Sequence, residues 1–210
     1  MSAFFLVFSE PGGRVSLDEF QDWYNNEHIP LRLNHLPQFL SGARYQSTDP
    51  GDDTWLSIYQ VTHPDIFSHP SYTTLRENRS PREADLVKRL ALLDRRCYHI
   101  VNVASSGVPC GFELGEHTTQ ALLTYASTTD KPPSIPSSLR THVLSLFDHS
   151  TMKHGATVST DYPEYHVVHE FANVADATTA ASLIDDPQLT QVKTFKLYRA
   201  YPCVAQGNLP

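Results

Sequence analysis

The chain has 210 residues, of which 40% are hydrophobic and 19% charged, a composition typical of folded globular proteins and unlike that of disordered chains. Its formal net charge is -7 at pH 7 and it carries no stripe of lysine and arginine, which argues against nucleic acid and anionic membranes as partners. The three cysteines are an odd number at wide spacing, so they predict neither a disulfide framework nor a zinc site and fit a reducing, cytoplasmic compartment.

The first predicted element is a strand at residues 3–8, an unbroken apolar run. This run is shorter than the apolar core of a secretory signal, and no basic region precedes it. It is also far shorter than a membrane-spanning helix, which needs about 20 residues. We therefore expect neither a targeting segment nor a membrane anchor at this end of the chain.

A helix is predicted to begin after Ser16, because Ser16 and Glu19 have the spacing of a capping box. The large aromatic residues that follow fall on one helical face, namely Phe20, Trp23 and Tyr24. Pro30 lacks a backbone N–H and restricts the residue before it, so we expect the helix to weaken or bend near His28.

The remainder of the first half predicts two strands, a helical stretch interrupted at Ser80 and Pro81, and a final strand. Bulky side chains on both faces of the second of these strands indicate that it is covered on both sides. The predicted segments are a strand at 39–46, a turn-rich connector at 47–53, a strand at 55–62, a helical stretch at 69–93 and a strand at 95–103.

The same order of elements recurs after a glycine- and proline-containing linker at residues 105–119. The two halves also align weakly, residues 55–61 with 165–171 and residues 97–99 with 197–199. The predicted segments of the second half are a strand at 121–126, a helix at 136–149, strands at 155–160 and 165–171, a helix at 175–184 and a strand at 194–201.

This repeat predicts an α+β fold of two ferredoxin-like halves, each with the order strand, helix, strand, strand, helix, strand. Each half alone would expose one face of its sheet, so we expect the two sheets to pack together. The divisions are residues 1–105, a linker at 106–120, and residues 121–210. Two separate domains on a tether are the alternative. The assembly is either a monomer with an internal pseudo-dimer or a homodimer.

A longer motif lies in the first half, Phe20-Gln-Asp-Trp-Tyr-Asn-Asn-Glu-His28-Ile-Pro-Leu-Arg32, followed by Pro37-Gln-Phe-Leu-Ser-Gly-Ala-Arg-Tyr45. It resembles the EthD-like family of dimeric α/β barrel proteins of the fungal polyketide-pathway type. The resemblance covers about the first hundred residues. The second half fits by element order alone and has no Glu-His-x-Pro counterpart in residues 136–149, which favours a packing role for it.

The resemblance implies an enzyme that works without metal or bound cofactor on a small aromatic or polyketide-like substrate. Relatives include decarboxylases, cyclases and anthrone oxygenases, and the family pocket lies between the sheet and helices of one ferredoxin-like unit. We expect a decarboxylase or cyclase that uses a histidine as general acid and base. An anthrone-type oxygenase and a non-catalytic barrel that binds a small ligand or a partner are the two alternatives.

His28 is the first candidate for catalysis, because a histidine titrates near neutral pH and the motif keeps its histidine at this helix end. Strand topology brings His63 to the same end of the predicted pocket. The substrate-binding candidates are aromatic walls at Trp23, Tyr24, Tyr45 and Tyr59, and an arginine handle for a carboxylate or phenolate at Arg32. Structural alternatives are His28 as a helix cap, His63 in a surface turn, Trp23 and Tyr24 in the core, and Arg32 in a solvated ion pair with Glu27.

Eleven histidines raise the question of a metal site. His166 and His169 are three residues apart, which on a strand places their side chains on opposite faces. No His-Glu-x-x-His motif, phosphate-binding loop or Gly-x-Ser-x-Gly elbow occurs. The sequence therefore predicts no metal site, and the resemblance implies that no bound cofactor is used.

Overall fold

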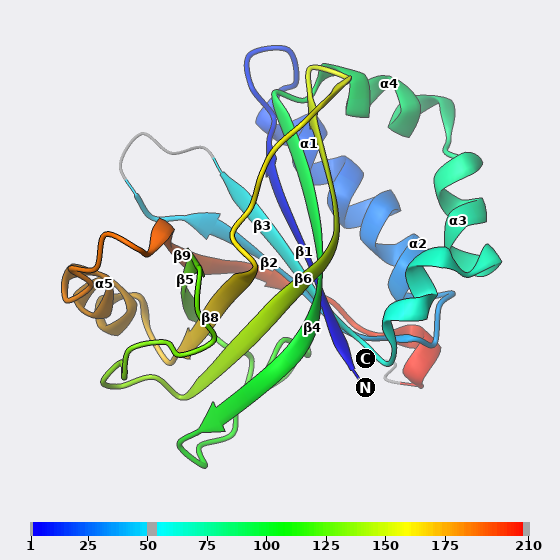
Figure 1. Ribbon diagram of the computed structural model, residues 1–210. Coiled ribbons are helices and arrows are strands. Elements are labelled where there is room, and N and C mark those ends of the chain that lie inside the picture. The colour runs from blue at the N-terminus through cyan, green and yellow to red at the C-terminus, as the bar shows by residue number, and fades with distance from the viewer. Residues whose placement is uncertain (1, 50–53, 208–210) are drawn as a thin grey trace.

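In the computed structural model, which describes residues 2–49 and 54–207, nine strands form one antiparallel sheet (Figure 1). The strand order is β4-β1-β3-β2-β9-β5-β8-β6-β7, and an additional pairing between β4 and β6 closes the sheet into a barrel. The strands are β1 (Ala3–Glu10), β2 (Phe39–Ser47), β3 (Trp55–Val61), β4 (Leu92–Ser105), β5 (Ala121–Ser127), β6 (Arg140–Lys153), β7 (Ala156–Val158), β8 (Tyr165–Phe171) and β9 (Thr190–Ala200).

The helices lie outside this barrel. Figure 1 shows α1 to α4 together on one side and α5 on the other. They are α1 (Leu17–Trp23), the π-helical turn η1 (Tyr24–His28), α2 (Ile29–Leu33), the 3-10 turn η2 (Pro64–Ser68), α3 (Pro70–Glu77), α4 (Pro81–Arg89), α5 (Val174–Ser182) and the 3-10 turn η3 (Val204–Gln206). The α-helices of the described residues have at most nine residues, and none could cross a membrane.

The two halves repeat one strand order, which confirms the predicted α+β fold of two joined ferredoxin-like sheets. The first half has the order β4-β1-β3-β2, and the second half has the equivalent order β9-β5-β8-β6. The halves then share both edges, because β2 pairs with β9 and β4 pairs with β6. This closure leaves no long unpaired edge on either half-sheet.

The prediction of a helix at residues 136–149 is wrong, because residues 140–153 form the 14-residue strand β6. Three prolines before it were typical of a helix start, yet the chain reaches β6 as an extended loop. Alternate residues of β6, including Leu144 and Leu146, face the barrel interior, and the strand pairs with β4 on one side and β8 on the other. Pairing with these two strands satisfies the backbone hydrogen-bonding groups of β6. The free energy gained from this pairing outweighs the local preference for a helix. Within the described part of the second half, α5 is the only α-helix.

Alternation along the strands separates the apolar side chains into an interior core and outer cores. In β1, Phe4 and Leu6 face the barrel interior, whereas Phe5 and Val7 face the helices of the first half. Strand β3 is covered on both faces as predicted, with Leu56 inside the barrel. The layer between the first half-sheet and α1 to α4 is the position in which the sequence predicts the functional site.

Candidate active site

The helix that carries His28 runs without a break from α1 through η1 into α2. It begins as predicted, since the Ser16 side chain accepts a hydrogen bond from the Glu19 backbone N–H at 3.2 Å. Pro30 has no N–H to continue the α-helical bonding, and the chain adopts a wide turn in which the Ile29 N–H donates to the Tyr24 carbonyl. This turn places His28 toward the neighbouring helix α4.

His28 forms a close pair with Glu83, which lies 55 positions later on α4. The distance from His28 Nδ1 to Glu83 Oε1 is 3.0 Å, and the side chains are 12% and 3% exposed. An ionised carboxylate can only accept hydrogen bonds, so Nδ1 carries the ring proton and donates a hydrogen bond to Glu83. The second ring nitrogen, Nε2, is then left with a free lone pair.

The protonation state of this pair follows from burial and from nearby arginines. Burial lowers the pKa of His28 to about 4, the charge of Arg32 acts in the same direction, and Glu83 opposes both. Burial alone would raise the pKa of Glu83, but the hydrogen bond from His28 and the charges around it lower that pKa. At neutral pH the pair is therefore a neutral imidazole held by a carboxylate.

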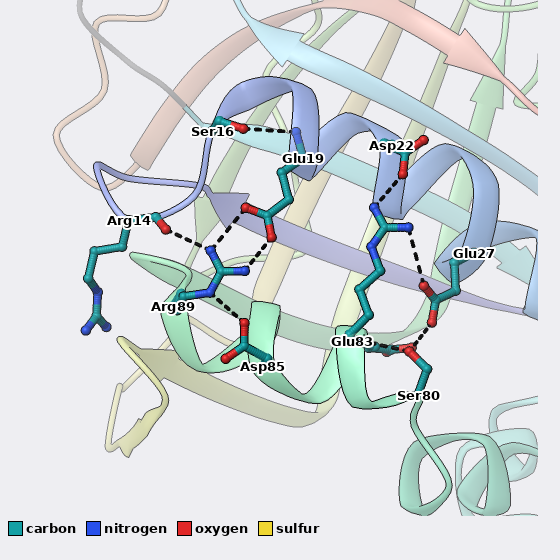
Figure 2. Close-up of polar contacts among 10 residues, drawn as sticks. Arg14, Ser16, Glu19, Asp22, Glu27, Ser80, Glu83, Asp85 and Arg89 are labelled. Carbon is teal, nitrogen blue, oxygen red and sulfur yellow. Dashed lines mark hydrogen bonds and ion pairs between the residues drawn. The ribbon is translucent and has the colours of Figure 1, made fainter.

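Contacts between α4 and the first helix fix the position of Glu83 (Figure 2). The Ser80 hydroxyl accepts a hydrogen bond from the Glu83 N–H at 3.0 Å and donates to the Glu27 carboxylate. At the other end of α4, Arg89 binds both carboxylate oxygens of Glu19. The helix is thus attached to α1 and η1 on both sides of Glu83, which sets the distance to His28.

Aromatic side chains surround His28, as the sequence predicts. The Trp23 and Tyr24 ring centroids lie 4.4 and 5.2 Å from the imidazole centroid. Tyr59 lies in the same core, and its hydroxyl has no hydrogen-bond partner among the described residues. The Trp23 and Tyr24 ring centroids are 4.4 Å apart, so these two rings are part of the buried core that encloses His28.

Arg32 also lies where the sequence predicts, beside His28. Its guanidinium donates to the His28 carbonyl oxygen at 2.6 Å, and its side chain is buried. Arg32 Nε has no hydrogen-bond partner in the described structure. The side chain therefore positions a positive charge next to the imidazole and retains one donor.

Arg44 is a candidate that the sequence analysis did not select. Its guanidinium lies 4.0 Å from the centroid of the Tyr24 ring and 5.1 to 5.3 Å from those of Phe20, Trp55 and Tyr198. Its side chain is fully buried. It donates to Gln21, while its Nε has no partner among residues that the structure describes. Because Tyr24 contacts both His28 and Arg44, the histidine and this cation belong to one cluster. The sequence could have indicated Arg44, because an arginine inside a predicted buried strand is unusual and often has a specific role.

Two predicted site residues lie elsewhere. Tyr45 follows Arg44 on β2, so its side chain faces the opposite side of the sheet, inside the barrel, where its hydroxyl donates to the Thr119 carbonyl at 3.0 Å. His63 is a half-exposed surface residue that caps η2 and lies 3.1 Å from the Asp65 carboxylate. The cluster of side chains around His28 therefore includes neither Tyr45 nor His63.

The histidines of β8 occupy opposite faces, as predicted from strand alternation. His166 packs against Phe8 and Tyr98 inside the barrel. His169 is on the α5 side, where Nε2 lies 3.0 Å from the Tyr125 hydroxyl. Among residues 2–49 and 54–207, no group of three or more His, Cys, Asp or Glu side chains is arranged to hold a metal ion.

Comparison with known proteins identifies the fold. No family model matches the chain, and no curated protein matches its sequence. The chain is similar to the solved structure of an anthrone oxidase-like protein, with a TM-score of 0.60 and 7% identity over 98% of this chain and 94% of that one. It also matches a structure named "putative monooxygenase from Lactobacillus acidophilus", with a TM-score of 0.47 and 9% identity over 97% of each chain.

A third match, a structure named "Putative Chlorite dismutase", has a TM-score of 0.47 and 12% identity over 100% of both chains. Identities this low establish the fold and nothing about the reaction. The closed sheet, the repeated strand order and the similarity to the anthrone oxidase-like structure agree. The chain has the dimeric α/β barrel fold, which EthD-like proteins also adopt, with both halves in one polypeptide.

Proposed function

We propose that this protein is a cofactor-independent enzyme acting on a small aromatic or polyketide-like molecule, with His28 as its proton-transfer residue. The observation that carries the proposal is the His28–Glu83 pair, a neutral imidazole oriented by a buried carboxylate beside aromatic rings. In such a pair the carboxylate fixes the tautomer and stabilises the imidazolium that forms when Nε2 takes a proton.

The protonation state of the pair makes His28 a base rather than an acid in the first step. With a pKa of about 4, its Nε2 carries no proton at pH 7 and can accept one, as a weak base. Removing a proton from a phenol or from carbon next to a carbonyl creates an anion, which the buried cations Arg32 and Arg44 would stabilise. A cyclising carbon–carbon bond step begins in this way. In a decarboxylase, the bond to the carboxylate breaks with release of CO₂, and His28 would give the resulting carbanion a proton that it had first taken from a substrate hydroxyl group.

Substrate entry requires movement, because aromatic side chains fill the layer beside His28. The π-helical turn is a suitable place for this movement, since its widened hydrogen-bonding pattern joins two short α-helices. A shift of α2 and α4 away from the sheet would expose Nε2 and the ring faces together.

An anthrone-type oxygenase is the second candidate, favoured by the fold similarity to a protein named anthrone oxidase-like. In that reaction the same base would remove a proton from the substrate, and the resulting anion would be oxidised by molecular oxygen. Oxygen consumption separates the two reactions, because a cyclase or a decarboxylase consumes none.

The experiment measures turnover of a panel of anthrones and aromatic polyketide acids by the wild type and by His28 variants, with and without oxygen. We expect His28→Ala to lower turnover at least about 100-fold, since a general acid–base group contributes about 10² to 10⁴ in rate. His28→Gln should restore stability, because its amide can donate to Glu83, but not turnover. The exposed His35→Ala variant is the matched control and should keep full activity.

The contrary result would be normal turnover per folded molecule in a His28→Ala protein that melts earlier. His28 would then be a structural partner of Glu83 and nothing more. Binding of the panel without any turnover in the wild type would favour the non-catalytic barrel.

A further inference from the structure

A partly open cavity lies inside the barrel, on the face of the sheet opposite to His28. It is a cavity of about 180 Å³ at the end where β1 finishes and β4 begins. We call it the barrel-mouth cavity, and its lining includes Phe8, Leu92, Asp94, Arg96, His166 and Gln191. A cavity of about 150 Å³ with apolar walls is large enough to hold benzene. The barrel-mouth cavity therefore has the size of one six-membered ring with a small substituent.

One wall of the cavity is formed by a buried arginine whose charge is paired. The Arg96 guanidinium lies 4.5 Å from the Phe8 ring centroid and 3.9 Å from that of Tyr162. It also donates to Asp94 Oδ2 at 2.7 and 3.0 Å and to Gln191 Oε1 at 2.8 Å. Its charge is thus neutralised by Asp94. The other two charged residues of the lining, Glu10 and Lys193, are of opposite sign, so the lining has no net charge that would select an ion.

His166 lines this cavity with a side chain whose hydrogen-bonding atoms are unpaired in the described structure. Its side chain is 1% exposed, and neither ring nitrogen has a hydrogen-bond partner among the described residues. Burial and then the charge of Arg96 lower the pKa of His166 well below its ordinary value, so the ring is neutral. A neutral imidazole offers one donor and one acceptor, and leaving both unpaired in the interior is costly.

We propose that the barrel-mouth cavity binds a small uncharged molecule with one ring and one hydroxyl group, a phenol in size and chemistry. The ring would lie against Phe8 and Leu92, and the hydroxyl would hydrogen-bond to His166. An uncharged ligand fits because Arg96 is already paired with Asp94. This site uses residues separate from the proposed His28 site, and the two proposals stand independently.

The test is ¹⁹F NMR titration of the full chain with 4-fluorophenol and with fluorobenzene, which has the same ring but no hydroxyl. We expect 4-fluorophenol to bind at least about tenfold more tightly, because only its hydroxyl satisfies His166. The ¹⁵N resonances of the His166 ring should shift with 4-fluorophenol. His166→Leu should abolish the preference between the two probes while fluorobenzene still binds.

Two further variants locate the site. Leu92→Trp, at the partly exposed rim, should block both probes, and His28→Gln should change neither affinity. The proposal is overturned if 4-fluorophenol fails to bind, if the His166 resonances do not move, or if Leu92→Trp leaves binding intact. It is also overturned if His28→Gln alone removes binding, which would assign the phenol to the His28 site. If His166→Leu does not fold, Leu92→Trp and the ring resonances still decide.

Discussion

At the scale of single residues, the protonation of His28 depends first on burial and then on two neighbours of opposite charge. Glu83 favours the imidazolium, and Arg32 disfavours it. Burial adds to the effect of Arg32, so the neutral ring is the stable form down to about pH 4. His28 is therefore available as a base over the whole neutral pH range. Its protonation, and the loss of activity that follows, should occur only in acid.

The pH profile of kcat/KM tests this balance. For the wild type we expect the acidic limb near pH 4, where His28 becomes protonated. Arg32→Gln removes a positive charge, which makes the imidazolium less unfavourable, so the limb should move upward toward 6.5. A purely structural role of Arg32 would lower activity at every pH and leave the limb in place.

At the scale of elements, α4 shows how a helix can position one side chain. Glu83 sits between two attachment points, the Ser80–Glu27 contact and the Arg89–Glu19 ion pair (Figure 2). The latter is bidentate and partly shielded, with side chains 28% and 34% exposed. Ion pairs in such settings contribute modestly to stability, but they can fix the orientation of a helix.

A double-mutant cycle on Arg89 and Glu19 measures this attachment. Urea unfolding of Arg89→Ala, Glu19→Ala and the double variant should give a coupling of about 0.5 to 1 kcal/mol. Arg89→Lys is the matched control, because it keeps the charge but loses the bidentate geometry, and it should recover only part of the coupling. Additive effects of the two single variants would show that the pair does not hold α4.

At the scale of the whole molecule, closure of the barrel joins the halves more tightly than a tether would. The interior core takes side chains from both, including Phe4 and Leu56 from the first half and Leu122 and Val168 from the second. Each half alone would expose this apolar face together with two unpaired strand edges.

Expression of residues 1–105 alone tests that dependence. We expect this fragment to aggregate or to self-associate into a dimer that closes its own barrel, as measured by light scattering after size exclusion, whereas the full chain unfolds in one cooperative step. A stable monomeric fragment with its own cooperative transition would instead support two tethered domains.

Buried neutral histidines should also make the stability of the whole protein depend on pH. Burial and then the charge of His142 lower the pKa of His169 to about 4, and that of His28 is similarly low. Between pH 6.5 and 4 the unfolded chain then binds more protons than the folded one. The free energy of unfolding should therefore fall as pH decreases through this window, by about 1 to 2 kcal/mol at pH 5 for His169 alone.

Urea unfolding at pH 7, 6 and 5 measures this effect. His169→Gln should flatten the pH dependence, because the amide does not titrate, whereas the exposed His35→Gln variant should not. An unchanged slope in His169→Gln would mean that His169 is not the source of the acid sensitivity.

The sequence by itself determined the features that depend on neighbouring residues. The Ser16 cap, the two-sided strand at Trp55–Val61 and the opposite orientations of His166 and His169 all follow from spacing along the chain. The ferredoxin-like order of the first half also followed from the sequence, whereas in the second half the sequence predicted a helix where β6 lies. Local spacing sufficed because caps and strand faces are set within a few residues.

Only the tertiary structure decided the features that depend on distant residues. Residues 140–153 form β6 rather than a helix because β4 and β8 supply hydrogen-bonding partners on both sides. His28 acquires Glu83 from 55 positions away, and Arg44 enters the cluster while Tyr45, its neighbour, turns into the barrel. Such pairings arise from closure of the barrel, and the free energy of burial and pairing across the sheet overrides what each local segment prefers.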